Sequence, residues 1–251
     1  MRILKRETIE NIGKEIFDCY RKLPEVKKDR IIYNVHPDLL IEKLLGFKVD
    51  HQHLSLTGDI LGITCTEEVG IEVYGEDDSD DIYMLDGKTI LIEKDLLYDQ
   101  KRFGQYQYTK CHEASHLIFK MKYPSDYGAR PGELPKPQFS HASRANNKGY
   151  ISDWGEWQAD VLAASILMPT ELILQNMFWA QLGDRIKLLN SVYAPAVYER
   201  FCNLASMLGV SKQALAYRMQ RLGLIEINHF DDPYQLIRIE RSEYDKDNTA
   251  R

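Results

Sequence analysis

The sequence predicts an α+β fold, in which a run of short strands is followed by a run of helices. The prediction rests on the spacing of the apolar residues. They recur at helical spacing at the N-terminus, form short β-rich runs between about residues 47 and 92, and return to helical spacing from about residue 99. Strands and helices in separate blocks indicate an α+β fold or separate domains. We expect a division into domains of residues 1–190 and 191–251.

The first block begins with helices and continues with strands. In "RETIENIGKEIFDCYRKL" the apolar side chains fall on one helical face, which predicts an amphipathic helix. "HPDLLIEKLLG" predicts a short helix, with Pro37 near its start and Gly46 at its end. Strands are predicted from "ILGITCT", "GIEVYG", "DIYML" and "TILIE", and "LDGKT" between the last two predicts a hairpin turn.

The second block is mainly helical. Helices are predicted from about residue 99 to 121 and from about 153 to 168, where Pro169 ends the second one. Between them, residues 123–149 predict a long, locally basic loop. Residues 194–241 predict two helices and a β-hairpin. The basic residues of the loop are Arg130, Lys136, Arg144 and Lys148.

Composition argues against several classes of protein. The net charge of −6 over 251 residues does not suit a generic polyanion binder. No apolar run is long enough to cross a membrane, and the start "MRILKRETIE" has no apolar signal core, so we expect neither membrane association nor export. The scattered cysteines form no C-x-x-C pair, which favours a reducing cytoplasm. They are Cys19, Cys65, Cys111 and Cys202.

The segment "YTKCHEASHLIFK" contains the pattern H-E-x-x-H, formed by His112, Glu113 and His116. Residues four apart lie on one face of a helix, so the two imidazoles can bind one cation. This is the arrangement of zinc hydrolases, in which the glutamate accepts a proton from the attacking water and is not itself a ligand. A catalytic zinc usually has three protein ligands, so the sequence must provide one more.

The segment "SDWGEWQADVLAASILMP" offers that third ligand. Glu156 and Asp160 stand four apart on an otherwise apolar helix, where two like charges repel each other and resist burial. A cation removes this difficulty, with Glu156 as the ligand and Asp160 holding the second N–H of a ligand histidine. Alternatively, Asp153 and Glu156 begin the helix as a capping box. Because that alternative leaves Asp160 without a role, we favour a metal site.

Other candidate residues carry less weight. His51 and His53 would lie on one side of a strand, and we expect a surface pair because a second metal site needs further ligands. A helix turns Cys111 away from the ligand face, so we expect a small buried residue. His141 and Tyr150 are candidates for stabilising an oxyanion, although exposed loop residues are the simpler interpretation.

The two motifs together resemble the ImmA/IrrE group of zinc metallo-endopeptidases, which pair H-E-x-x-H with a later E-x-x-A-[ND] and L-M-P. The resemblance covers most of the chain. It departs from the family at Ser115, where glycine is common, and in the length of the loop between the motifs. The residues of the second motif that match in register are Glu156, Ala159, Asp160, Ala163, Ala164, Leu167, Met168 and Pro169.

This resemblance implies a zincin-like metallopeptidase core with a small sheet and a helical, helix-turn-helix or winged-helix-like C-terminal part. It implies zinc bound by His112, His116 and Glu156, with Glu113 as the general base. It also implies a narrow substrate, typically a helix-turn-helix repressor that is cleaved to release its target genes. Such regulation occurs in mobile elements and in stress responses.

The long loop of residues 123–149 leads at both ends into helices that carry the expected metal ligands. We therefore expect it to border the active-site cleft and to select the protein substrate.

The segment "ASMLGVSKQALAYRMQRLGL" has the spacing of a helix-turn-helix, with Gly209 in the turn and Ser211 capping the second helix. Lys212, Arg218 and Arg221 make that helix basic, which suggests DNA binding. Three cations reach few phosphates, so we favour a structural or partner-docking role. Two alternatives to a peptidase remain: a DNA- or repressor-binding transcription regulator with a structural or inactive metal site, and a toxin–antitoxin-style partner that binds a repressor without cutting it.

Overall fold

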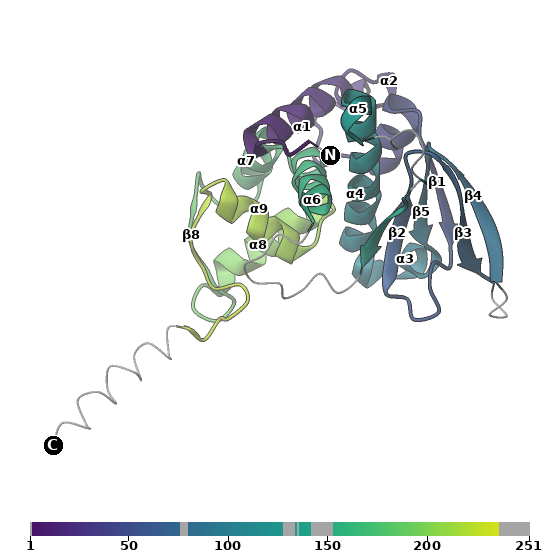
Figure 1. Cartoon of the computed structure of the whole chain (residues 1–251). Helices are drawn as coiled ribbons and strands as arrows, with labels where there is room; N and C mark the ends of the chain where they lie inside the picture. The colour runs from purple at the N-terminus through teal and green to yellow at the C-terminus, as the bar shows by residue number, and fades with distance from the viewer. Residues whose placement is uncertain (1, 76–79, 128–133, 135, 142–152, 236–251) are drawn as a thin grey trace. The chain divides into compact units, whose positions relative to one another are not determined.

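The computed structural model describes residues 2–75, 80–127, 134, 136–141 and 153–235 (Figure 1). The chain forms two compact units, Met1–Pro169 and Thr170–Arg251. The boundary predicted between residues 190 and 191 therefore falls inside the second unit. Pro169 ends one long helix, and the segments that follow it pack with the C-terminal helices and strand. Both units combine helices with short strands, as expected for an α+β protein.

The first unit is built around two long helices, α4 and α6, which pack against each other. The N-terminal helix α1 packs on α6 and buries the apolar face that its spacing predicts, including Ile9, Ile12 and Phe17. The helices of this unit are α1 (Arg6–Tyr20), α2 (Pro24–Lys27), η1 (Leu39–Leu44), α3 (Lys94–Tyr98), η2 (Gln100–Arg102), α4 (Phe103–Lys122), α5 (Pro124–Tyr127) and α6 (Trp154–Leu167).

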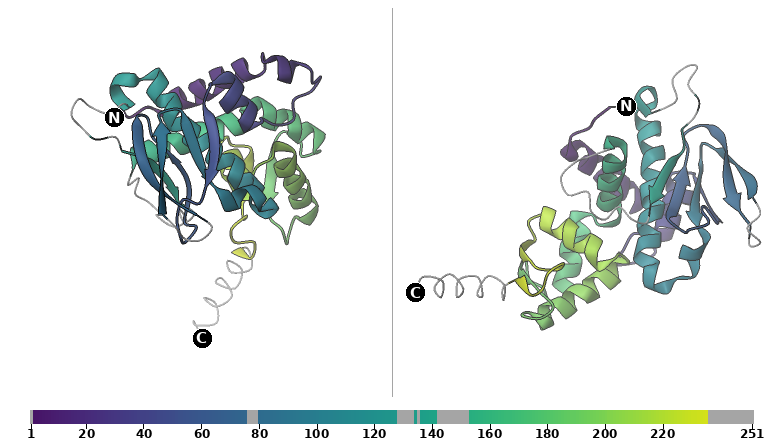
Figure 2. Two further views of the ribbon diagram at one scale, coloured as in Figure 1. Left: turned by 90° about the vertical axis from the view of Figure 1, so that its right-hand side faces the viewer. Right: turned by 60° about the horizontal axis from the view of Figure 1, so that its bottom comes forward.

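A four-stranded sheet lies on the side of α4 away from α6, as Figures 1 and 2 show. Its strand order is β1-β5-β2-β6, with β1 parallel to β5 and the other pairs antiparallel. Strand β5, one of the two inner strands, is buried along its whole length, as its apolar run "ILI" predicts. The strands are β1 (Lys48–Gln52), β2 (Ile60–Thr64), β5 (Thr89–Glu93) and β6 (Gln138–His141).

The other two strands of this unit, β3 (Glu68–Tyr74) and β4 (Asp80–Asp86), form a separate antiparallel ribbon. An apolar cluster that includes Ile71, Leu85, Ile63 and Leu91 packs this ribbon against the larger sheet. The hairpin predicted at "LDGKT" is wrong, because β4 and β5 pair in different sheets. The turn itself is present, and Gly87 has the positive φ of 74° that favours glycine.

The prediction of one long loop over residues 123–149 is wrong in part. The helix α5 follows α4 directly, and β6 adds an edge strand to the sheet beside β2. A four-residue strand is too short for its apolar pattern to be distinguished from a loop. Lys136 is exposed. Three further residues of the predicted substrate-selecting loop lie outside the described residues: Arg130, Arg144 and Lys148.

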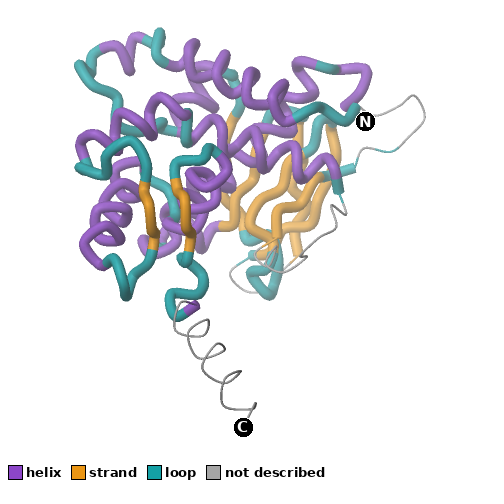
Figure 3. The backbone as a smooth tube through the Cα atoms, turned by 90° about the vertical axis from the view of Figure 1, so that its left-hand side faces the viewer, coloured by secondary structure: helices purple, strands orange, loops and turns teal. Residues whose placement is uncertain are grey.

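The second unit contains α7 (Thr170–Trp179), β7 (Ile186–Leu189), α8 (Pro195–Leu208), α9 (Lys212–Arg221) and β8 (Ile225–Asn228). The helices α8 and α9 lie where they are predicted. Gly209 ends α8 with φ 69°, and the Ser211 hydroxyl caps α9 by accepting the Ala214 N–H at 3.1 Å. The predicted β-hairpin is wrong, because β8 pairs in parallel with β7, the strand before α8 (Figure 3).

Across the described parts of the chain, none of the helices taken singly has the length and apolar character of a membrane span. The helices Trp154–Leu167 and Thr170–Trp179 have this length and apolar character only when they are counted together, and they are bent by 44° at the break between them.

Candidate metal centre

The middle of α4 is buried on all sides, because α6 covers one face and the sheet covers the other. His112, Glu113 and His116 lie in this stretch, with 1%, 0% and 7% of their surface exposed. Burial of two imidazoles and a carboxylate is costly unless each has a polar or charged partner. The positions of those partners therefore indicate what the helix is built to hold.

The first turn of α6 brings Glu156 to the two imidazoles. Asp153 caps the helix, accepting the Gly155 N–H at 2.7 Å and the Glu156 N–H at 3.4 Å. Glu156 is the third residue of the helix, and its carboxylate lies against His112 and His116. The capping interpretation and the metal interpretation of this segment are thus compatible, since the cap uses the Asp153 side chain and the Glu156 backbone.

Three donor groups converge at this point. The His112 and His116 Nε2 atoms are 3.2 Å apart, and they lie 3.2 and 3.3 Å from the two Glu156 carboxylate oxygens. A tetrahedral ion with ligand bonds of about 2.0–2.1 Å requires donor atoms about 3.3–3.4 Å apart. The observed separations match this requirement, so His112, His116 and Glu156 lie close enough to hold a metal ion.

Asp160 supplies a separate argument for a cation. Its Oδ1 atom lies 2.9 Å from His112 Nδ1, which fixes that nitrogen as a donor. A neutral His112 ring then has only a lone pair on Nε2, and this lone pair faces both His116 Nε2 and the Glu156 carboxylate. Such a group of acceptors needs positive charge between its members. A metal ion supplies that charge to all three donors at once, whereas a proton on one ring serves only part of the group.

Glu156 has the electrostatics of an ionised ligand. Burial opposes its ionisation, but hydrogen bonds and positive charge from protonated His112 and His116 rings outweigh that effect and hold the pKa of Glu156 well below its ordinary value. A metal ion would take the place of those ring protons. With two carboxylates, Glu156 and Asp160, around two neutral imidazoles, the centre carries an excess of negative charge. Such a centre favours a divalent cation.

Glu113 lies beside these groups and points to the sheet. One carboxylate oxygen, Oε1, accepts a hydrogen bond from the Ser140 hydroxyl of β6, and Oε2 is buried with no hydrogen-bond partner among the described residues. Burial raises the pKa of Glu113, an effect that the charges of His112 and His116 and the Ser140 hydrogen bond oppose. A buried carboxylate with one unoccupied oxygen is suited to accept a proton.

The structure thus brings together every residue singled out in the two motifs. His112, His116 and Glu156 converge, Asp160 holds the second nitrogen of His112, and Glu113 lies next to them without being part of the donor cluster. Ser140 was missed by sequence reasoning, because it lies in the segment predicted as a loop. Only the short run "QFSH" could have indicated a strand there.

The surface pair predicted at His51 and His53 is wrong. Both are partly buried, with His51 Nε2 2.9 Å from the Tyr106 hydroxyl and His53 Nδ1 3.0 Å from Glu93 Oε1. His53, Glu93 and Asp95 lie close enough to hold an ion. However, Glu93 already accepts the backbone N–H groups of Leu54 and Asp95, so a role in joining β5 to α3 explains its burial.

Of the other candidate residues, Cys111 has a structural role, and the side chains of His141 and Tyr150 lie outside the described residues. Cys111 is fully buried, which raises the pKa of its thiol to about 12 and makes it inert. The backbone of His141 ends β6, and its side chain lies outside the described part, as does all of Tyr150. Neither can be assigned to an oxyanion site.

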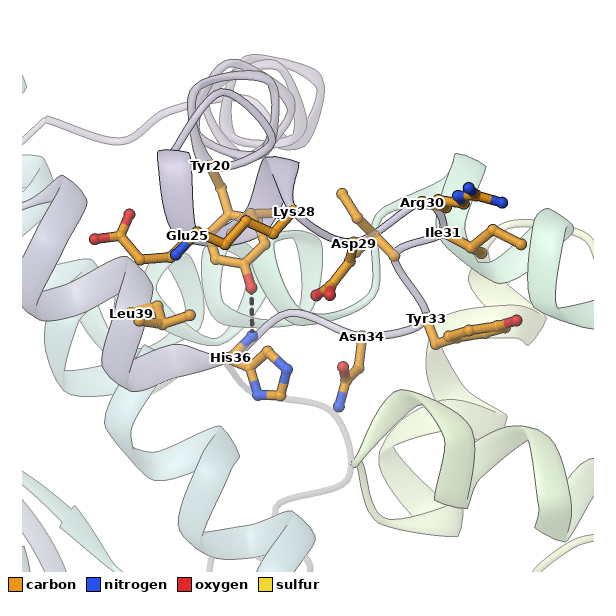
Figure 4. A pocket seen from close by; sticks show the side chains of 12 residues that line it. Tyr20, Glu25, Lys28, Asp29, Arg30, Ile31, Tyr33, Asn34, His36 and Leu39 are labelled. Carbon is orange, nitrogen blue, oxygen red and sulfur yellow. Dashed lines mark hydrogen bonds between the residues drawn. The ribbon is translucent and has the colours of Figure 1, made fainter.

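A hollow of about 570 Å³ lies between the end of α1 and η1, away from the motif residues (Figure 4). The Tyr20 hydroxyl accepts the His36 N–H at 3.0 Å in its wall. Charged side chains of both signs line the hollow, so it has no single electrostatic character. They are Glu25, Lys28, Asp29 and Arg30.

No model of a known protein family matches this chain, and no curated protein matches its sequence.

Proposed function

We propose that the protein is a zinc-dependent, site-specific endopeptidase. The observation that carries this proposal is the convergence of His112, His116 and Glu156 beside a buried Glu113 that is not part of the cluster. Structural zinc sites usually have four protein ligands and no adjacent base, whereas catalytic sites have three ligands and an open position. The resemblance to the ImmA/IrrE group and its zincin-like core supports the same assignment.

Zinc suits the donor set better than other divalent ions. Two imidazoles and one carboxylate form a common catalytic zinc set, while magnesium and calcium prefer oxygen ligands throughout. When bound by three protein ligands, zinc acts as a Lewis acid towards a carbonyl and makes water a better nucleophile.

Asp160 and Glu113 have separate roles in the proposed reaction. Asp160 keeps the Nδ1 proton on His112, so that Nε2 of the same ring remains a ligand atom. Glu113 accepts the proton of the attacking water on Oε2, the oxygen without a partner among the described residues, and passes it to the leaving amine. The high pKa that burial gives Glu113 suits both transfers.

A protein substrate, most simply a helix-turn-helix repressor, follows from the ImmA/IrrE resemblance. Cleavage of the repressor would release the genes that it controls. The reaction would take place in the cytoplasm, a setting that suits the free cysteines of the described chain.

The alternative is a transcription regulator that binds DNA or a repressor, with a metal site that is structural or inactive. The capped α8–α9 pair favours it, but the charge on α9 gives it little support. Arg218 is only 4% exposed, which leaves Lys212 and Arg221 as the exposed cations predicted to reach phosphates. Binding of DNA weakens with the loss of each phosphate contact, so we place this function second.

The test uses the purified full chain and a helix-turn-helix repressor, sought among the genes that neighbour its own. Zinc content and repressor cleavage are measured together, with and without a chelator, for the wild type, Glu113→Gln and a matched exposed control, Glu25→Gln. We expect zinc in all three proteins, and cleavage by the wild type and the control alone. Repressor binding without cleavage by the zinc-loaded wild type would favour the alternative. Loss of zinc from Glu113→Gln would make Glu113 a ligand.

A further inference from the structure

Glu113 of α4 contacts the four-stranded sheet through strands β6 and β2. Ser140 of the edge strand β6 donates its hydroxyl hydrogen to Glu113 Oε1, and both residues are buried. Ser140 pairs with Gly62 of β2, which pairs in turn with Ile92 of β5. These three positions lie side by side across the sheet, on the face that packs against α4.

Gly62 makes this close approach sterically feasible. A Cβ atom at this position would lie 2.8 Å from Thr109 Cγ2 and 2.9 Å from both Cγ and Oε1 of Glu113. Such distances are too short for carbon atoms in contact, so a larger residue would push the Glu113 side chain or the whole strand away. The requirement for glycine is therefore spatial, because two residues of α4 occupy the volume that a side chain would fill.

The terminal torsion of a glutamate is soft, since rotation of its carboxylate has no sharp minima. A base that takes a proton from water must nevertheless present one oxygen within about 2.6–3.2 Å of it. Something outside the side chain must therefore select the orientation. At Glu113 the sheet supplies two constraints: the bare backbone of Gly62 close to Cγ and Oε1, and a single donor, Ser140, on Oε1.

We infer that Ser140 and Gly62 are positioning residues that fix the Glu113 carboxylate, so that Ser140 occupies Oε1 and Oε2 alone is presented for proton transfer. What Glu113 does rests on the proposed function, whereas the contact itself does not. Ser140 touches neither the metal-ligand cluster nor a reacting atom, and it acts through Glu113. The edge strand β6 is thus part of the catalytic apparatus by virtue of one hydroxyl.

The test combines stability with kinetics on the zinc-loaded full chain. The variants are Ser140→Ala, Ser140→Thr, which keeps the hydroxyl, and Ser165→Ala, a matched buried serine on α6 whose hydroxyl bonds to the Glu10 carbonyl. Each is made in the wild type, and Ser140→Ala also in Glu113→Met, which keeps the shape of the side chain but has no acceptor. Zinc content, melting temperature, and kcat and KM for repressor cleavage are measured.

We expect Ser140→Ala to keep its zinc and its KM but to lose about 10–100-fold in kcat, the usual range for a residue that orients a catalytic group. Ser140→Thr should restore most of the loss, and Ser165→Ala should leave kcat unchanged. Ser140→Ala should lower the melting temperature in the wild type and have no further effect in Glu113→Met, because the hydrogen bond is already absent there. Gly62→Ala should likewise reduce kcat while zinc remains bound.

Two results would overturn the inference: an unchanged kcat in Ser140→Ala, or a melting-temperature loss of the same size in Glu113→Met as in the wild type. A failure of the proposed function gives a different pattern. The wild type would then cleave nothing, while the stability coupling between Ser140 and Glu113 persisted and supported the contact.

Discussion

His112 Nδ1 lies 2.9 Å from Asp160 Oδ1, so the same helix that supplies the carboxylate of the cluster also fixes the ring of its first histidine. Asp160 follows Glu156 by one helical turn on α6, and both face α4. The contact is supported from α4 in return, because the Tyr108 hydroxyl donates to the Asp160 carbonyl at 3.0 Å. A single helix–helix contact therefore assembles the whole donor set.

The first prediction concerns Asp160. Asp160→Asn keeps the size of the side chain but no longer provides a charged acceptor for the His112 Nδ1–H. We expect zinc affinity to fall about 10–100-fold, as is usual when the partner of a ligand histidine is lost. Tyr108→Phe should cost less, because the Tyr108 hydroxyl bonds to the Asp160 carbonyl at 3.0 Å and only at 3.4 Å to Oδ1, the oxygen that holds His112. Competition with a chelator of known affinity measures the zinc affinity of both variants. Wild-type affinity in Asp160→Asn would contradict the role of Asp160 in holding the His112 ring.

The second prediction separates the two roles of the first turn of α6. Glu156→Ala removes a donor group and should lose more zinc affinity than Asp160→Asn. Asp153→Ala removes the helix cap, at a cost of about 1 kcal/mol in the free energy of unfolding, and should keep its zinc. Metal titration and chemical denaturation of the two variants give the comparison. If Asp153→Ala empties the site and Glu156→Ala does not, Glu156 only begins the helix.

The cluster of His112, His116 and Glu156 could be predicted from the sequence because its geometry is local. Each motif lies within one helix, and helical spacing alone places His112 above His116 and Glu156 before Asp160. Only the meeting of the two helices had to be assumed, and the burial of like charges on an apolar helix gave the reason. The same holds for the turn at Gly209, which depends on neighbouring residues only.

Features that depend on pairing between distant segments could not be predicted. The partner of β8 is β7, which precedes two helices, and no local pattern distinguishes this arrangement from a hairpin. Ser140 reaches Glu113 because β6 joins the edge of the sheet at β2. The division into compact units depends on such contacts too, since the packing of α7 with α8 determines to which unit residues 170–190 belong.

The third prediction concerns Lys110, which is fully buried on α4 and pairs with Asp38 at 2.6 Å. Its ammonium group also lies 4.0 Å from the centre of the Tyr106 ring. The Asp38 side chain is 57% exposed, so the two partners of this ion pair differ in their access to water. Removing Asp38 should therefore change the free energy of unfolding by a different amount than removing Lys110.

Asp38→Asn leaves a buried cation without its counter-charge, which we expect to cost up to about 3 kcal/mol in the free energy of unfolding. Lys110→Met leaves Asp38 hydrated and keeps an apolar chain of similar volume, so its cost should be below about 1.5 kcal/mol. Chemical denaturation of both single variants and the double variant measures these values. A larger loss in Lys110→Met than in Asp38→Asn would show that the pair is more than a means of neutralising a buried charge.

The last prediction concerns the packing of α1 on α6, the helix that carries Glu156. A Cβ atom on Gly13 would lie 2.2 Å from Ser165 Oγ and 2.7 Å from Ser165 Cβ, so the two helices approach closely where these residues meet. Gly13→Ala should therefore overpack this contact, at about 1–3 kcal/mol in the free energy of unfolding. Ser165→Gly alone should cost about 1 kcal/mol, through the low helix propensity of glycine together with the loss of the hydroxyl that bonds to the Glu10 carbonyl. The double variant, Gly13→Ala with Ser165→Gly, moves the glycine from α1 to α6 and restores the space between the helices. Its loss in the free energy of unfolding should therefore be clearly smaller than the sum of the two single losses. Chemical denaturation of the four proteins completes the cycle, and strictly additive losses would mean that Gly13 is there for a reason other than its contact with Ser165.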